Sequence, residues 1–466
     1  MSELHPLEPD AAALDAMTAA CVAFVRAQVL SLATQPSFDL DGAAPLCASF
    51  RERVPETATG TMDALLVRLA PAFAKSFNTA GPGYLAFIPG GGIVTAALAD
   101  YVALSLNRYV GVHKAAPALA QIEATAIDWL ASLMGYPPSA RGLLTSGGSM
   151  SNLTAIVTAR IAELPDDFLR GVLYVSTETH SSIAKAARLA GFPTKNVRTV
   201  PVDARMRLVP EALVRAIAED RARGMVPFMV VANVGTTNTG AIDPLPEILD
   251  IAHAHGLWVH ADAAYGGFFR LVPGGDALLA ALDRCDSITL DPHKGLFLPY
   301  GTGCLLVRDG DLLMHAHESH AEYLKDVDAD PGAVNFTDLS PELSRDFRGL
   351  RVWLPLALHG LGAFRAALAE KLALARVAYE SLLAEPLLEM VDAPQLSVVA
   401  FRMRAGDAAS AELLRRVNAR KRVFLSSTTL EKKFTLRICV LSFRTHDEHV
   451  RLATSAILEE ARSIAS

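Results

Sequence analysis

Between residues 142 and 309 the chain alternates short apolar runs with segments that have a helical pattern. The helical segments, such as 150–163 and 245–255, lie between most of the apolar runs. Strands that alternate with helices form βαβ units, whose largely parallel sheet is covered by helices on both faces. The alternation therefore predicts an α/β fold with one mostly parallel central sheet. The expected strands are GLLTS (142–146), GVLYVS (171–176), PFMVVANVG (227–235), LWVHAD (257–262), SITLD (287–291) and GCLLVRD (303–309).

The chain on either side of this region has a different pattern. Residues 1 to about 75 are rich in Ala and Leu with charges at helical spacing, which predicts helices. After about residue 348 the chain is again helical, and it closes with strand-like runs at 396–403 and 434–443 and a last helix. We therefore expect three parts: a helical N-terminal segment (1–105), a large α/β domain (106–360) and a small C-terminal α+β domain (361–466).

Charge and cysteine usage exclude several classes of protein. With 43 Lys and Arg against 50 Asp and Glu, the net charge is −7. The sequence has no basic block of the kind that binds nucleic acid, so we expect no nucleic-acid partner. The five cysteines are scattered and never spaced CxxC, which argues against a disulfide framework and a thiolate metal site and suits a reducing, cytoplasmic location. The N-terminus lacks the pattern of a signal peptide, and no run of about 18 uncharged apolar residues predicts a membrane span.

Polar residues with chemical potential follow the predicted strands. Ligands of an open α/β sheet bind outside the carboxyl ends of its strands, so residues at these positions are the candidates for a site. They are SGGSMSN (146–152), TETHSS (177–182) with His180, NVGTTNTG (233–240), Asp262, and DPHK (291–294) with Asp291, His293 and Lys294.

Each of these features also has a purely structural interpretation. The Gly-rich turn before a helix can be a capped helix start, or a place where the backbone N–H groups of Gly147 and Gly148 bind an anion. Asp262 can be a helix cap or the partner of a buried cation, and Lys294 can be a solvated charge or an amine for imine chemistry. Taken together, an anion cradle, a buried acid, an imidazole and a lysine are what pyridoxal 5′-phosphate (PLP) needs.

Five motifs in one order resemble those of the group II PLP-dependent amino-acid decarboxylases, which include the aromatic-L-amino-acid decarboxylases. The resemblance extends from about residue 80 to 450 and implies PLP-dependent fold type I and a homodimer with an exchanged N-terminal segment. The motifs are LLTSGGSMSNL (143–153), YVSTETHSSIAKAARLAGF (174–192), VGTTNTGAIDP (234–244), VHADAAYGG (259–267) and SITLDPHKGL (287–296).

The resemblance implies a role for individual residues. Lys294 matches the lysine that forms an imine with PLP, Asp262 the partner of the pyridine nitrogen, and His180 the histidine stacked on the ring. Ala264 matches the residue on the other ring face and Thr237 a hydroxyl of the cofactor site. Positions near the phosphate or the lysine are matched by Gly148, Ser149 and His293. The family usually has Asn where this chain has Asp291, and a carboxylate beside a phosphate is unfavourable, so we expect its side chain to point elsewhere.

The substrate side of the site is less defined by the sequence. The segment YLAFIPGGG (84–92) matches the loop that lines the family's substrate pocket, which makes Phe87 and Ile88 candidate wall residues, and Tyr300 is a further candidate. These residues favour an aromatic over an acidic substrate, but they do not identify the amino acid. Gly295 stands where some relatives have a large aromatic residue, which suggests a wider site.

The expected reaction is decarboxylation of an L-amino acid, expected to be aromatic, to an amine and CO2. In the family, a lid tyrosine is thought to protonate Cα after CO2 leaves, and counting back from Phe347 places Phe336 at that position. A phenyl ring donates no proton, and members with Phe there include aldehyde synthases. The alternative is therefore oxidative decarboxylation to an aldehyde with ammonia and peroxide. Transamination, with Arg437 or Arg444 as a carboxylate clamp, and a non-catalytic PLP-binding protein are further alternatives.

Overall fold

The computed structural model describes residues 5, 7–318 and 333–466. At its centre is a sheet of seven strands in the order β1-β7-β6-β5-β4-β2-β3. All neighbouring pairs from β6 to β3 are parallel, and only β7 runs against its neighbours. The predicted mostly parallel sheet is therefore confirmed. The strands are β1 (Arg141–Thr145), β2 (Gly171–Ser176), β3 (Val197–Val200), β4 (Val226–Asn233), β5 (Trp258–Asp262), β6 (Ser287–Leu290) and β7 (Gly303–Val307).

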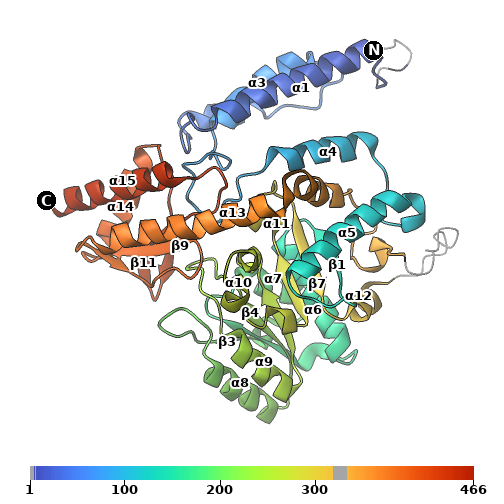
Figure 1. Ribbon diagram of the computed structural model, residues 1–466, viewed down its shortest axis with the longest axis vertical. Helices are drawn as coiled ribbons and strands as arrows, with labels where there is room; N and C mark the ends of the chain where they lie inside the picture. The colour runs from blue at the N-terminus through green and yellow to red at the C-terminus, as the bar shows by residue number, and fades with distance from the viewer. Residues whose placement is uncertain (1–4, 6, 319–332) are drawn as a thin grey trace.

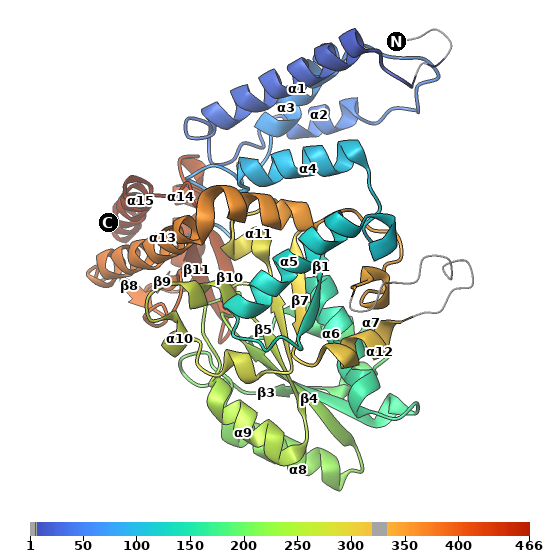
Figure 2. The same ribbon diagram turned by 45° about the vertical axis from the view of Figure 1, so that its right-hand side comes forward.

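Helices cover both faces of this sheet (Figure 2). On one face α6 packs along β4 to β7, with α7 and α12 against it, whereas α8 and α9 pack against β4 from the other face. The middle strands have no exposed residue after their first, since both of their faces are covered. The helices of this region are α5 (Pro117–Leu133), α6 (Gly148–Glu163), α7 (Ser181–Leu189), α8 (Pro210–Ala222), α9 (Leu245–His255), α10 (Gly275–Leu278), α11 (Pro292–Gly295) and α12 (Gly310–His317).

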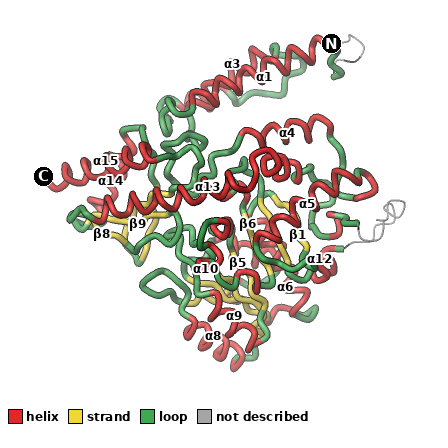
Figure 3. Tube along the Cα trace, in the orientation of Figure 1, coloured by secondary structure: helices red, strands yellow, loops and turns green. Residues whose placement is uncertain are grey.

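A second, smaller sheet lies near the C-terminus, and the yellow strands of Figure 3 fall into these two groups. It is antiparallel, in the order β10-β11-β9-β8, and consists of β8 (Leu388–Met390), β9 (Val398–Met403), β10 (Ser426–Leu430) and β11 (Lys433–Cys439). It packs with α14 (Asp407–Ala419) and α15 (Asp447–Ala465). The long α13 (Gly349–Leu383) connects the two sheets and is interrupted at Gly360, whose φ of +71° is not helical.

The N-terminal helices lie along one side of the molecule, where α1 and α3 run side by side, apart from the large sheet (Figure 1). Many of their apolar side chains are exposed, among them Leu14, Val22 and Leu30. The loop that follows α3 passes beside the small sheet, where Leu85 N–H donates to Phe424 O at 2.9 Å. The helices are α1 (Ala11–Ser31), α2 (Ala43–Ser49), α3 (Met62–Ala74) and α4 (Val94–Leu106). The boundaries of the three predicted parts stay a prediction.

Two helices, α1 and α13, have the length and apolar composition of a membrane span. Length and composition alone are weak grounds for a span, because core helices and signal sequences share them. About a quarter of the most apolar window of α13 is buried inside the protein (28%), but only 6% of that of α1.

Candidate active site

A cavity of about 250 Å³ lies where β2, β4, β5 and β6 end and α6 begins. Its position follows from the topology, because the carboxyl ends of parallel strands meet at one edge of the sheet. The structure brings together at this cavity all nine residues that the sequence predicts for the cofactor site. These are Gly148, Ser149, His180, Thr237, Asp262, Ala264, Asp291, His293 and Lys294.

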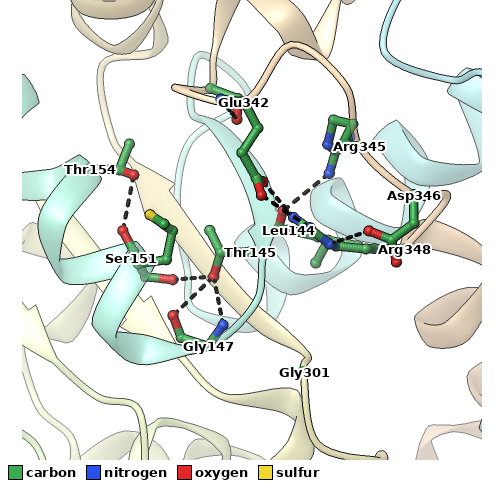
Figure 4. A network of polar contacts seen from close by, with 12 residues as sticks. Leu144, Thr145, Gly147, Ser151, Thr154, Gly301, Glu342, Arg345, Asp346 and Arg348 are labelled. Carbon is green, nitrogen blue, oxygen red and sulfur yellow. Dashed lines mark hydrogen bonds and ion pairs between the residues drawn. The ribbon is translucent and has the colours of Figure 1, made fainter. Parts of the chain in front are cut away.

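The Gly-rich turn between β1 and α6 is held in place by Thr145 (Figure 4). The Thr145 hydroxyl accepts from Gly147 N–H at 3.2 Å and lies 2.8 Å from Ser151 Oγ. Gly147 has a φ of +148°, which L residues rarely adopt, and a Cβ on Gly303 would lie 2.5 Å from Gly147 Cα. The turn therefore needs glycine at position 147, and the adjoining strand β7 needs glycine at position 303. The turn leaves the N-terminus of α6 open to an anion.

Two buried arginines brace the end of β1 next to this turn (Figure 4). Arg345 and Arg348 both donate to Leu144 O, at 3.0 and 3.1 Å. Arg345 also forms an ion pair with Glu123 at 2.6 Å, in which neither side chain is exposed to solvent. Breaking one partner of such a pair leaves a buried charge, so the segment around 345–348 is strongly tied to the sheet.

Asp262 ends β5 and faces the cavity with only 8% of its surface exposed. Its Oδ2 accepts from Asn152 Nδ2 at 3.1 Å, and its Oδ1 accepts from Ala264 N–H at 3.3 Å. Among the described residues no cation pairs with this carboxylate. Donors that favour the charged form of a buried carboxylate make it a suitable partner for a protonated ring nitrogen. Asn152, four residues after Gly148 on α6, is a site residue that sequence analysis did not assign.

Lys294 reaches the cavity from α11 and is paired with Asp291. Its Nζ lies 2.9 Å from Asp291 Oδ2, and His293 Nε2 lies 3.6 Å from the same oxygen. The expectation that Asp291 points elsewhere is wrong, because its side chain is 2% exposed and faces both Lys294 and the Gly148 turn. Its Oδ1 is buried without a hydrogen-bond partner in the described chain.

His180 and Thr237 are held at the cavity by local bonds. His180 is the N-cap of α7, where its Nδ1 accepts from Ser182 N–H at 3.3 Å. The Thr237 carbonyl accepts from Arg437, whose guanidinium also contacts the Cys439 sulfur. Arg444 donates to the backbone carbonyls of Ala80 and Gly91. Neither arginine lines the cavity, so the carboxylate clamp required for transamination has no support here.

The three predicted substrate-wall residues do not line this cavity. Ile88 is 9% exposed and packs in the core of the large domain, while Phe87 is 53% exposed. Tyr300 lines a neighbouring cavity of about 200 Å³, which shares His293 with the main one. The Tyr300 and His293 rings lie 5.8 Å apart, so Tyr300 remains near the chemistry.

Two further expectations are corrected by packing. Phe336, in η7 (Phe336–Asp338), is 1% exposed and lies in the core with the Arg345 guanidinium 5.0 Å from its ring centre. This placement argues against the catalytic role predicted for Phe336, because the ring does not reach the cavity. Gly295 does not widen the site, since a Cβ there would lie 2.7 Å from Phe268 Cβ.

The cavity fits the chemical groups of PLP. The Gly147–Gly148 turn suits a phosphate, Asp262 a ring nitrogen and Lys294 an aldehyde, and Ala264 and His180 line the same cavity. Asp291 is the one group of the wrong charge for the phosphate end. No cluster of three His, Cys, Asp or Glu side chains able to hold a metal ion occurs in the part of the chain that the structure describes. The fold and the site together define a PLP-dependent enzyme of fold type I.

Comparisons with known proteins agree with this assignment. Residues 50–404 match the model of the pyridoxal-dependent decarboxylase conserved domain. An aromatic-L-amino-acid decarboxylase of Bacillus atrophaeus is 37% identical over 88% of both chains. A crystal structure of Oryza sativa TDC with PLP and tryptamine superimposes with a TM-score of 0.93 at 29% identity, covering 99% of both chains. The structure of Rhodiola rosea 4-hydroxyphenylacetaldehyde synthase has a TM-score of 0.90 at 25% identity, covering 98% of this chain and 99% of that one.

The chain belongs to the pyridoxal-dependent decarboxylase family. It is a PLP-dependent enzyme that decarboxylates an amino acid.

Proposed function

We propose that the substrate is an aromatic L-amino acid and that the products are its amine and CO2. The observation that carries this is the charge of the cavity wall: Lys294 is the one Lys or Arg among the described residues that line it. A substrate with a side-chain carboxylate needs a cationic partner, and Lys294 is engaged by the cofactor. The similarity to an aromatic-L-amino-acid decarboxylase of Bacillus atrophaeus and to tryptophan decarboxylase 1 of Oryza sativa also supports an aromatic substrate.

Different residues of the cavity have different roles in the proposed reaction. When bound, PLP supplies a ring that takes up the electrons left at Cα when CO2 departs. Lys294 provides the amine for the cofactor aldehyde, and Asp262 holds a proton on the ring nitrogen. The N–H groups of Gly148 and Ser149, at the start of α6, would hold the phosphate. No cationic clamp other than Lys294 lines the described wall, so the substrate carboxylate is weakly held, which favours its loss as CO2.

The test is product analysis of the PLP-loaded enzyme in air. It is incubated with L-Phe, L-Tyr, L-Trp, L-DOPA and, as a control, L-Glu, and CO2, amine, aldehyde and peroxide are quantified together. We expect amine to match CO2 for at least one aromatic substrate and no CO2 from L-Glu. CO2 from L-Glu alone would overturn the substrate class. Aldehyde and peroxide in amounts that match CO2 would instead make the enzyme an aldehyde synthase.

We further propose that the enzyme is a homodimer. The exposed apolar residues of α4, which include Leu98, Tyr101, Leu104 and Leu106, support this, because each is more than half exposed in the single chain. The exposed apolar residues of α1, among them Val22 and Leu30, add to this surface, and extended exposed apolar surface is typical of protein interfaces. Sedimentation analysis should give twice the chain mass, and Leu104→Glu should shift the protein toward the monomer. A wild-type protein of single-chain mass at micromolar concentration would contradict the proposal.

A reducing, cytoplasmic location is also part of the proposal. All five cysteines are free thiols in the structure, and three of them are buried. Free buried thiols are typical of proteins from reducing compartments. Fractionation of the source cells, followed by detection of the protein, tests this location.

A further inference from the structure

A line of buried polar side chains runs from inside the large sheet to Asp262. Trp258 Nε1 donates to Ser287 Oγ at 2.8 Å, and the same hydroxyl lies 2.8 Å from His260 Nδ1. His260 Nε2 lies 3.0 Å from Asn152 Oδ1, and Asn152 Nδ2 donates to Asp262 Oδ2 at 3.1 Å. All five side chains belong to residues that are at most 8% exposed. Water therefore has little access to these bonds.

The chemistry of the groups fixes the direction of every bond. An ionised carboxylate only accepts, so the Asn152 amide nitrogen faces Asp262 and its oxygen faces His260. That oxygen needs a donor, which places the His260 proton on Nε2. Burial lowers the pKa of His260 to about 4, so the ring is neutral at pH 7 and carries one proton. Nδ1 then accepts from the Ser287 hydroxyl, whose oxygen accepts from Trp258.

Two neighbouring hydroxyls are consistent with this direction. Thr289 Oγ1 lies 3.3 Å from His260 Nε2 and can share its proton as a second acceptor. Ser182 Oγ accepts from the Asn152 amide at 3.0 Å, so both amide hydrogens point toward acceptors. A flipped Asn152 would place its carbonyl oxygen against the Asp262 carboxylate and its amide against the His260 proton. Both contacts are repulsive.

We propose that His260 and Asn152 are positioning residues that hold Asp262 as a hydrogen-bond acceptor for the ring nitrogen of PLP. His260 precedes Asp262 by two residues on β5, so both side chains point to the same face of the sheet. Asn152 on α6 bridges them, and through it the strand and the helix fix one orientation of the carboxylate. The proposal rests on the cofactor and not on which amino acid is decarboxylated, so it survives if the aromatic substrate is wrong.

The test is cofactor binding to variants of the full-length enzyme, followed by the visible absorbance of bound PLP. His260→Phe keeps a ring of similar size but removes the contacts to Ser287, Asn152 and Thr289. We expect the PLP dissociation constant to rise about tenfold and the absorbance band to change. His260→Gln keeps a donor that can reach Asn152 Oδ1, and it should restore most of the affinity. If His260→Phe does not fold, Asn152→Leu removes the bond to His260 from the helix side together with the bond to Asp262, and it should lose at least as much affinity.

A matched control separates positioning from stability. His317 is a second histidine whose pKa burial lowers to about 4, and its Nε2 lies 3.2 Å from Thr158 Oγ1, away from the cavity. His317→Phe should lower the melting temperature without changing PLP affinity or absorbance. The double variant His260→Phe/Asn152→Leu should lose no more affinity than Asn152→Leu alone, because His260 acts on Asp262 through Asn152. Additive losses, or a His260→Phe enzyme that differs from the parent only in melting temperature, would overturn the proposal.

Discussion

Lys294 Nζ lies 2.9 Å from Asp291 Oδ2, so the amine that binds the cofactor is paired with a carboxylate at the phosphate end of the cavity. A Cβ placed on Gly148 would lie 3.2 Å from the same oxygen, which shows how near this charge is to the anion turn. The family usually has Asn at the position of Asp291. The chain therefore has a negative charge that both repels a phosphate and competes for the lysine.

Replacing this carboxylate should strengthen cofactor binding. Asp291→Asn removes the repulsion of the phosphate and frees Lys294 from its ion pair, and both effects lower the PLP dissociation constant. A charge a few ångströms from a phosphate at an effective dielectric constant of about 20 is worth a few kcal/mol, so we expect an increase in affinity of about tenfold or more. Titration of the apoenzyme with PLP measures it.

The control for this variant is Asp250→Asn, which removes a carboxylate paired with Arg284 on the surface. It should leave PLP affinity unchanged. Weaker PLP binding by Asp291→Asn would mean that the Asp291 ion pair helps to place Lys294, and the repulsion argument would then fail.

Lys294 itself should be indispensable for turnover but not for retention of the protein fold. It is the one amine at the cavity among the described residues, and its surroundings contain no second group able to form the covalent link. Lys294→Ala should lose the visible absorbance of the bound cofactor and at least about a thousandfold in kcat. The exposed Lys185→Ala serves as control. Turnover by Lys294→Ala at the wild-type rate would show that the cofactor lysine is assigned wrongly.

The strand ends of the parallel sheet explain why most of the site could be predicted. Asp262, His180 and Lys294 follow separate apolar runs, and parallel strands bring such positions to one edge. The missed strands lack this signal: β8 has three residues, β3 has four of which one is buried, and β10 (SSTTL) has a single large apolar residue. Short polar strands form because a neighbouring strand supplies their hydrogen bonds, which no local pattern records.

The errors have a different physical origin. Ile88 was predicted to face the substrate, yet the chain around it turns between the two sheets and buries it in the large core. Phe336 was placed at the position of the family's lid tyrosine by counting back from Phe347 along the sequence. Neither the direction of a loop side chain nor the length of a loop is fixed by residue type. Only packing, as between Phe336 and Arg345, decides them.

Phe336 should matter for stability and not for the identity of the product. Phe336→Tyr buries a hydroxyl beside the Arg345 guanidinium and should destabilise the fold, while amine stays the product. Phe336→Ala should cost about 3–5 kcal/mol of unfolding free energy. Product analysis and denaturant unfolding measure the two effects. The products of these variants should be compared with those of Tyr323→Phe. Tyr323 is the tyrosine nearest before Phe336 in the sequence, and it lies outside the described residues. A change from amine to aldehyde in Phe336→Ala, with PLP still bound, would contradict a structural role.

The low pKa values of His260 and His317 predict how stability depends on pH. Burial lowers both pKa values from 6.5 to about 4. Between pH 6.5 and 4 the unfolded chain therefore binds more protons at these two sites than the folded chain, and stability falls as pH falls. One such site contributes at most about 3 kcal/mol, since one pKa unit is worth about 1.4 kcal/mol.

Several acids act in the opposite direction, because burial raises the pKa values of Asp100, Asp128, Glu163 and Asp286 as well as that of Asp243. Burial raises the pKa of Asp243 to about 6, so the folded chain binds this proton more tightly and the site adds stability at low pH that is lost as pH rises toward 6. We expect the two histidine shifts to outweigh those of the acids and to leave a net loss of stability on acidification. Urea unfolding at pH 7 and pH 4.5 should therefore give a lower free energy at pH 4.5, and His317→Phe should reduce the difference between the two values. A difference as large in His317→Phe as in the parent would show that this histidine is not held neutral by burial.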